Sequence, residues 1–241
     1  MKLQTLAAVA AFATLFASTA SAAVTVTYGA PGQQNTTVPL AISGVETFDA
    51  RSGGDFTTDF GTGGVITGSY SSPSILAADQ YGGAGGTGAY AMTWSSYQLD
   101  LTTTQPGGVN YLGLWLSAVD AGNTIQLFNG STQLFTLTGT DVMNALADDW
   151  HYKGNPTDAF KDQDYGEKFV FVNLASTTAF DRVVFSASGG GLETDNHTVG
   201  YAAAPVPEPT TWIMMIVGFG GVGGMLRARR RLVLEPARAP V

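Results

Sequence analysis

The chain has 241 residues, of which 19 are acidic and 11 basic, so its formal net charge is −8. This length suits one domain of ordinary size with additional terminal segments. A hydrophobic content of 44% argues against disorder of the whole chain. The acidic balance disfavours a nucleic-acid partner, because phosphates would be repelled. The sequence has no cysteine, which excludes thiol catalysis, disulfide bonds and thiolate zinc sites.

The N-terminal 22 residues have the organisation of a secretory signal peptide. Lys2 supplies a positive charge, residues 6–16 are apolar, and Ala20-Ser21-Ala22 forms an A-x-A cleavage site. We therefore expect export of the protein, with cleavage after Ala22.

Residues 23–204, called the module below, are predicted to fold as an antiparallel β-sandwich or jelly-roll-like single domain. The module contains 5 basic and 17 acidic residues, which gives it a net charge of −12. Short strands joined by Gly-rich turns, without alternating strands and helices, are typical of all-β antiparallel folds. Apolar alternation and β-branched residues predict strands over residues 23–28, 89–94, 111–119, 124–128, 132–138, 168–174, 180–187 and 198–202.

Other segments of the module are also assigned from their composition. Residues 51–90 contain 11 Gly in 40 positions, so we expect long loops there with one or two edge strands. Asn129-Gly130 predicts a hairpin turn. Residues 140–146 predict a short helix capped by Thr140 or Asp141. Residues 193–196 are polar and predict a turn that precedes the last strand.

The C-terminal part of the chain has the pattern of a membrane anchor. Pro207-Glu208-Pro209 precedes Trp212, and the apolar run that follows ends in a cluster of arginines. Tryptophan at one boundary and arginine at the other predict a single transmembrane helix over about 210–226 that ends in the cytoplasm. The arginines of this cluster, residues 227–231, are Arg227, Arg229, Arg230 and Arg231. Residues 232–241 would then be a cytoplasmic tail.

Residues 205–231 resemble the PEP-CTERM sorting signal, in particular its PEPxxWA variant. The resemblance rests on Pro207-Glu208-Pro209, Trp212, the apolar run and the arginine cluster, while Ile213 stands where the variant has Ala. It implies processing by a membrane-embedded exosortase and delivery to the cell surface or an exopolysaccharide matrix. An anchor that is never cut is the alternative. Residues 100–200 also resemble, more loosely, the β-sandwich modules that accompany this signal, which in general have no assigned reaction.

The residues that carry common catalytic chemistry are sparse. His151 and His197 are the only histidines, and neither a G-x-S-x-G nor an H-E-x-x-H motif is present. We expect His151 in an exposed loop and His197 in the turn after Asn196. Trp115 lies in a predicted core strand. For Trp94 and Trp150, packing in the core or at its rim is favoured over a sugar-binding platform.

Three functions follow as competing expectations. The favoured one is a non-catalytic exported protein of the cell surface or exopolysaccharide matrix, and thus not an enzyme. The alternative is a carbohydrate-binding, lectin-like module on the same sandwich. A secreted glycoside hydrolase comes third, because 17 carboxylates guarantee that some pair lies close together but select none.

Two groups of oxygen ligands are candidates for a structural calcium ion. Glu46 and Asp49 lie near the start of the module, and Glu193, Asp195 and Asn196 near its end. They would converge on one cation if the first and last strands were adjacent. The second group consists of Asp158, Asp162, Asp164 and Glu167. Carboxylates that are simply solvated are the favoured alternative to both.

Overall fold

The computed structural model describes residues 22–147, 149–202 and 219. One set of strands is β1 (Val24–Tyr28), β2 (Ile42–Glu46), β5 (Ser74–Ala77), β6 (Ala89–Thr93), β8 (Val109–Ser117), β11 (Val170–Phe180) and β13 (Leu192–Tyr201). The other is β3 (Phe56–Thr58), β4 (Ile66–Ser71), β7 (Ser96–Thr103), β9 (Thr124–Asn129), β10 (Thr132–Thr138) and β12 (Arg182–Ser186). Helical segments are η1 (Ala84–Gly86), α1 (Gly139–Ala145), η2 (Trp150–Tyr152) and η3 (Asp158–Phe160).

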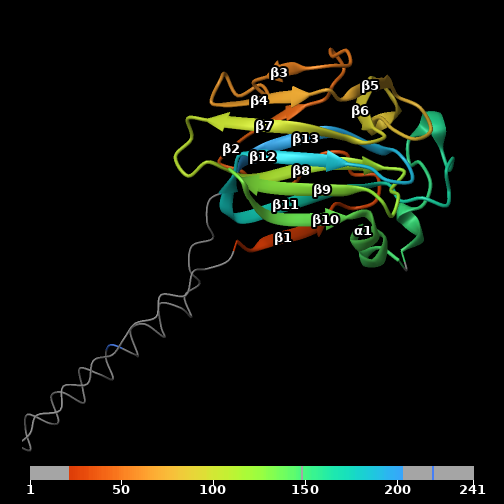
Figure 1. Ribbon diagram of the computed structural model, residues 1–241. Coiled ribbons are helices and arrows are strands. Elements are labelled where there is room, and N and C mark those ends of the chain that lie inside the picture. The colour runs from red at the N-terminus through yellow and green to blue at the C-terminus, as the bar shows by residue number, and fades with distance from the viewer. Residues whose placement is uncertain (1–21, 148, 203–218, 220–241) are drawn as a thin grey trace, which may run out of the picture. The chain divides into compact units, whose positions relative to one another are not determined.

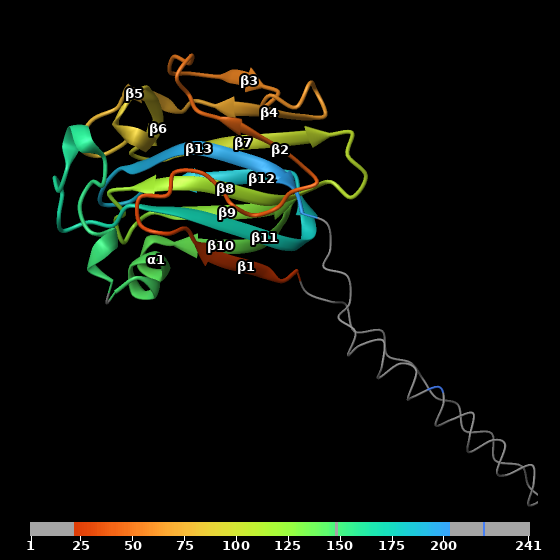
Figure 2. The same ribbon diagram turned by 180° about the vertical axis from the view of Figure 1, so that it is seen from behind.

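These strands form two sheets that pack face to face (Figure 1, Figure 2). The first sheet has the order β1-β11-β8-β13-β6-β5, with β2 also paired to β13. The second has the order β10-β9-β12-β7-β4-β3. All strand pairings within the described residues are antiparallel. The predicted all-β sandwich is therefore confirmed.

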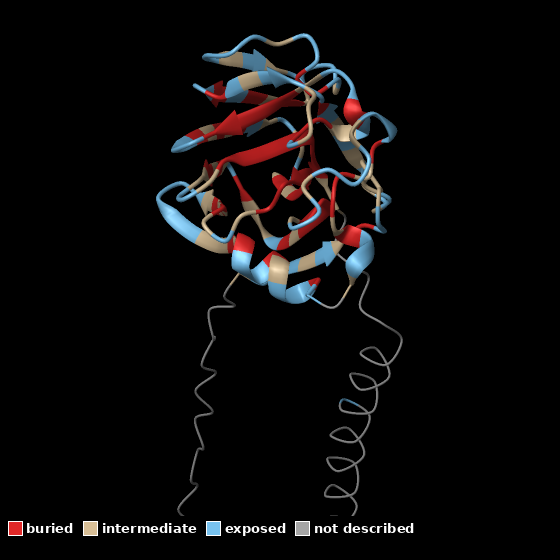
Figure 3. Ribbon diagram, turned by 90° about the vertical axis from the view of Figure 1, so that its right-hand side faces the viewer, coloured by how far each residue is buried: buried red, intermediate tan, exposed pale blue. Residues whose placement is uncertain are grey.

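Strand β8 is central in the first sheet and apolar on both faces, as its sequence predicts. Leu112 and Leu114 are fully buried in the main core between the sheets. Trp115, on the opposite face, packs in a second cluster with Phe169 and Phe171. Figure 3 shows that buried residues concentrate in the inner strands, whereas the peripheral loops are exposed. The apolar run of β8 thus serves two separate hydrophobic clusters.

Residues 51–90 contain more regular structure than their composition predicts. Strand β4 is not an edge strand, since it lies between β3 and β7. Ile66 and Tyr70 are buried at alternate positions, and Gly68 lies between them. A Cβ atom at Gly68 would stand 2.7 Å from side-chain atoms of both Leu99 and Phe60. The glycine that weakened the strand pattern is therefore required for close packing.

The predicted turn at residues 193–196 is wrong, because these residues belong to β13. This strand pairs with β2, β6 and β8, and residues 193–196 are buried. Its register against β8 shifts between Asp195 and Thr198, and Asn196 has a positive φ of 48°. A β-bulge thus lets a polar run continue through a central strand.

The predicted hairpin turn and the predicted short helix are both present, but the residue that caps the helix differs from the prediction. Gly130, at the predicted hairpin, has a φ of 56° and donates its N–H to both carboxylate oxygens of Asp181. The predicted short helix is α1, but its cap is Thr138 and not Thr140 or Asp141. The Thr138 hydroxyl accepts the N–H of Asp141, and the Asp141 carboxylate accepts the N–H of Thr138. This reciprocal capping box fixes the start of the helix.

The two predicted terminal segments lie mostly outside the described residues. The signal peptide covers residues 1–22, of which Ala22 is described, and the anchor over about 210–226 includes only Phe219. Within the described part of the chain, no helix combines the length and apolar character needed to cross a membrane.

Candidate functional site

The predicted first calcium group is brought together only in part. Strands β2 and β13 pair, with Glu46 opposite His197, so the start and the end of the module are adjacent as expected. The Glu46 carboxylate, however, forms an ion pair with Arg51 at 2.7 Å and accepts the N–H of Phe48 at 2.9 Å. Asp49 accepts the N–H of Ala89 at 2.9 Å. These oxygens already have protein partners.

Two residues of this group on β13 also bond to other protein groups. Asp195 accepts the N–H of Ala84 at 2.7 Å and that of Asn196 at 2.6 Å. The Asn196 side chain donates to the carbonyl of Gln34 at 3.0 Å. Among the described residues, no three Asp, Glu or His side chains are placed to hold a metal ion. Of the five predicted ligands, four therefore already bond to other protein groups: Glu46, Asp49, Asp195 and Asn196.

The four residues of the second candidate calcium group differ in how far they are buried. Asp158 and Asp162 are exposed, whereas Asp164 and Glu167 are half-buried. One oxygen of each of these half-buried carboxylates is shielded from solvent and has no hydrogen-bond partner. Burial raises the pKa of Asp164, and the Asp79 carboxylate adds to it. Burial also raises the pKa of Glu167, which Asp120 and Asp164 raise further.

A glycoside hydrolase would need a carboxylate pair that a substrate can reach. Burial, together with the Asp120 carboxylate, raises the pKa of Glu193 to about 8. Burial likewise raises the pKa of Asp195 to about 7. Both residues are buried in β13, with 7% and 3% of their surface exposed. They line neither of the two hollows described below.

His197 is a core residue and not a turn residue. It is fully buried, and its Nδ1 atom lies 2.9 Å from the Tyr70 hydroxyl. The rings of Phe48 and Phe185 have their centroids 4.9 Å from that of the imidazole. Burial lowers the pKa of His197 to about 3, so the ring is uncharged at neutral pH. Its Nε2 atom has no hydrogen-bond partner.

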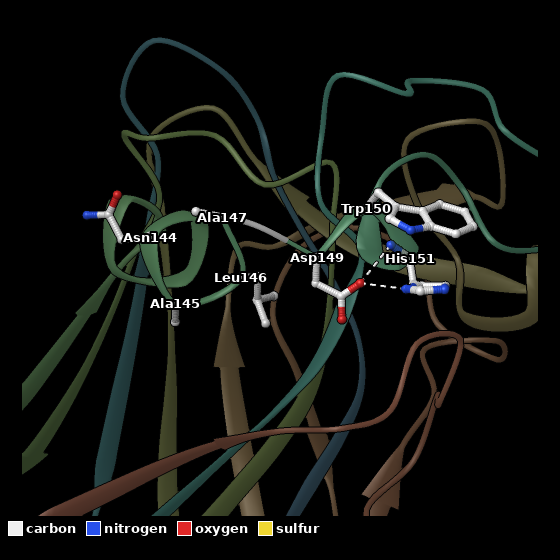
Figure 4. A pocket seen from close by; sticks show the side chains of 7 residues that line it. All are labelled: Asn144, Ala145, Leu146, Ala147, Asp149, Trp150 and His151. Carbon is white, nitrogen blue, oxygen red and sulfur yellow. Dashed lines mark hydrogen bonds and ion pairs between the residues drawn. The ribbon is translucent and has the colours of Figure 1, made fainter.

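The other histidine belongs to an exposed aromatic pair in η2, which Figure 4 shows from close by. The Asp149 carboxylate accepts the backbone N–H of His151 at 2.9 Å and contacts its Nδ1 at 2.7 Å. The ring of Trp150 stacks on that of His151, with centroids 3.9 Å apart and planes inclined by 28°. The expected exposure of His151 is confirmed.

Two hollows adjoin this aromatic pair. The first has a volume of about 490 Å³, and Figure 4 shows Asn144 and Ala145 of α1 on the side opposite Trp150 and His151. The second has a volume of about 390 Å³ and brings Trp150 and His151 together with Tyr165. Its other lining residues are Pro31, Gly32, Lys153, Gly154, Asn155, Pro156, Lys161 and Asp162.

The expected packing of two tryptophans is wrong. Trp150 is 63% exposed and Trp94 is 69% exposed, whereas Trp115 is buried as predicted. Trp94 directly follows β6, and Trp150 begins a one-turn helix between acidic and polar neighbours. Polar residues on both sides of each tryptophan are the signal that favours exposure, and periodicity alone does not report it.

The described residues define an antiparallel two-sheet β-sandwich, and the chain continues into the segment that resembles a sorting signal. The model of the PEP-CTERM protein-sorting motif matches residues 205–231. The chain thus carries this sorting motif, which indicates an exported surface protein that an exosortase processes. Comparison with curated proteins and with solved structures gave no match. The predicted sorting residues lie within the matched span and outside the described residues: Pro207, Glu208, Pro209, Trp212, Arg227, Arg229, Arg230 and Arg231.

Proposed function

We propose that the protein is a non-catalytic component of the cell surface or exopolysaccharide matrix, sorted through a PEPxxWA-type signal. The observation that carries this proposal is the sorting motif at residues 205–231 on a chain whose module is a β-sandwich. The two acid groups whose pKa values are raised most, those of Glu193 and Asp195, are buried on β13. A module with a structural role and no catalytic activity accounts both for the sorting motif and for the burial of these acid groups.

The start of the fold agrees with removal of a signal peptide after Ala22. The Ala23 N–H donates to the Thr177 hydroxyl at 3.0 Å, and the Ala23 carbonyl accepts the N–H of Thr177 at 2.9 Å. Strand β1 then pairs with β11 from Val24 onward. A chain that begins at residue 23 therefore keeps every strand of the sandwich.

In this proposal, the C-terminal segment acts before the module reaches its destination. The apolar stretch over about 210–226 holds the exported chain in the membrane, with Arg227 to Arg231 on the cytoplasmic side. The exosortase then cuts near Pro207-Glu208-Pro209 and releases the module from its anchor.

Replacement of the three motif residues tests this sequence of events. Pro207→Ala, Glu208→Ala and Pro209→Ala together should leave export intact but keep the protein in the membrane fraction at a higher mass. Thr210→Ala with Thr211→Ala, at the variable positions that follow the motif, is the control and should be sorted as the wild type. If fractionation and mass stay the same in both variants, the protein is a plain anchored protein instead.

A carbohydrate-binding module is the second candidate function. The observation that favours it is the exposure of Trp150 and Tyr165 at one hollow, since large aromatic side chains seldom stay exposed together without a role in binding.

A further inference from the structure

We infer that the hollow between Trp150 and Tyr165 binds the pyranose rings of an extracellular polysaccharide. The inference rests on the proposed function, because an exported module is the one that meets such polymers. The two aromatic side chains are 63% and 56% exposed. A sugar ring has one apolar C–H face and a rim of hydroxyl groups. It can therefore lie against an aromatic ring while its hydroxyls bind polar neighbours.

The aromatic platform is held in place before any ligand binds. Trp150 stacks on His151, and the Asp149 carboxylate fixes His151 through two contacts at 2.7 and 2.9 Å. The buried ammonium of Lys168 donates to the Asp149 carbonyl at 2.8 Å, and to that of Leu146 at 2.5 Å, which ties the loop to the sandwich. A side chain fixed in this way loses little conformational entropy on binding.

Other residues that line the hollow are fixed by a different set of bonds. Asn155 is buried, and its backbone N–H donates to the Gln163 carbonyl at 2.8 Å. Its side-chain amide donates to the Gln80 carbonyl at 3.0 Å. The Asp162 N–H donates to the Asn155 carbonyl at 2.9 Å. The hollow is therefore preformed, as small-ligand sites usually are.

Polar groups are available at the rim of the hollow. Lys153, Lys161 and Asp162 line it, and within the described residues none of their side chains forms a hydrogen bond or an ion pair. An ammonium group donates to hydroxyl oxygens, and a carboxylate accepts from hydroxyl groups. Two of the module's five basic residues meet here, although its net charge is −12. This combination of donors and acceptors suits a polyhydroxylated ligand.

The size of the hollow favours a saccharide over a protein partner. A volume of about 390 Å³ lies at the lower end of the range for small-ligand pockets, roughly 300–1,000 Å³. A stable protein interface would need a total buried area of about 1,200 Å² or more. The lining also includes two lysines and an aspartate, which a purely apolar ligand would leave unsatisfied.

The test measures binding of the full-length protein to a panel of polysaccharides at about 0.15 M salt. The panel contains neutral hexose polymers and uronic-acid polymers, and affinity is measured by titration calorimetry. We expect at least one polymer to bind. Trp150→Ala and Tyr165→Ala should each weaken that binding roughly tenfold or more, as for other exposed aromatic anchors. Trp150→Phe should retain part of the affinity.

Trp94→Ala is the matched control, because Trp94 is 69% exposed but lies outside the hollow. Its affinity should equal that of the wild type, and the melting temperatures of all variants should be unchanged. Failure of every polymer to bind would overturn the inference, as would equal losses in Trp94→Ala and Trp150→Ala. Self-association that requires Trp150, without glycan binding, would identify a protein interface and overturn it too.

These results are distinguishable from failure of the proposed function. A protein that is exported and sorted but binds no glycan contradicts only the inference about the hollow. A protein that is not exported contradicts the proposed function, whatever its affinity for polysaccharides in solution.

Discussion

A buried, uncharged histidine should make the stability of the sandwich depend on pH below neutrality. His197 is fully buried on β13, and burial lowers its pKa from the ordinary 6.5 to about 3. Protonation would place a charge among Phe48, Tyr70, Tyr97 and Phe185. The phenol of Tyr70 bonds the ring at Nδ1, but none of these four side chains carries a compensating negative charge.

The sign and size of the effect follow from proton linkage. The unfolded chain takes up a proton on this residue near pH 6.5, whereas the folded chain does so only near pH 3. The unfolded state therefore binds more protons between these values, and acid lowers the free energy of unfolding. The contribution is fully present above pH 6.5 and is lost as pH falls toward 3. Between about pH 7 and about pH 4.5, the loss is roughly 2 to 3 kcal/mol.

The assay compares urea denaturation of the wild type and of His197→Phe across this pH range, followed by tryptophan fluorescence. The variant keeps an aromatic ring but cannot be protonated. Carboxyl groups that titrate in both proteins cancel in the difference between their free energies of unfolding. Relative to the variant, the wild type should become less stable by roughly 2 to 3 kcal/mol between about pH 7 and about pH 4.5.

Two controls isolate the cause. Tyr70→Phe removes the hydrogen bond to Nδ1 but keeps the histidine, so the acid loss should persist. His151→Phe removes the other histidine, which lies at the surface, but keeps His197, so its difference from His197→Phe in the acid range should persist. A stability difference between wild type and His197→Phe that stays constant with pH would refute the reasoning.

Two further predictions concern the same module. Because the pKa of Glu193 is raised to about 8, its contribution to stability is present below its ordinary pKa of 4.5 and is lost as pH rises through 8. Glu193→Gln should therefore reduce the fall in melting temperature between about pH 6 and about pH 9, and an equal fall in both proteins would contradict this. Residues 23–204 should fold without the terminal segments, since every described strand lies within them; a far-UV circular dichroism spectrum dominated by helix would reject the prediction.

Alternation of apolar residues was enough to predict most of the strands. Residues 111–119 carry large apolar side chains on both faces, and β8 is indeed buried on both sides. The Asn129-Gly130 hairpin was also predictable, because the turn requires a positive φ that glycine adopts easily. These signals are local, so they do not depend on how distant segments meet.

The features that the sequence did not reveal depend on contacts between distant segments. The run from Glu193 to Asn196 has the composition of a turn, yet it lies in a central strand. Its polar side chains can be buried there because groups from distant parts of the chain form hydrogen bonds with them. Among them are the Ala84 N–H, which Asp195 accepts, and the Gln34 carbonyl, to which Asn196 donates. The exposure of Trp150 likewise depends on where the loop before β11 folds back, and no periodicity encodes that.

The polar character of β13 also means that buried groups of one strand change the stability of the protein with pH in opposite directions. Glu193, Asp195 and His197 occupy alternate positions of this strand and are all buried. Acid opposes folding through His197 but favours it through Glu193, whose carboxyl group prefers the protonated state inside the protein. Between about pH 7 and about pH 4.5, the gain from Glu193 alone is about 3 kcal/mol, and Asp195, whose pKa is raised to about 7, adds a gain of the same sign. Burial of groups with opposite proton preferences on one strand therefore offsets part of the loss from His197, and single-residue variants separate the individual contributions.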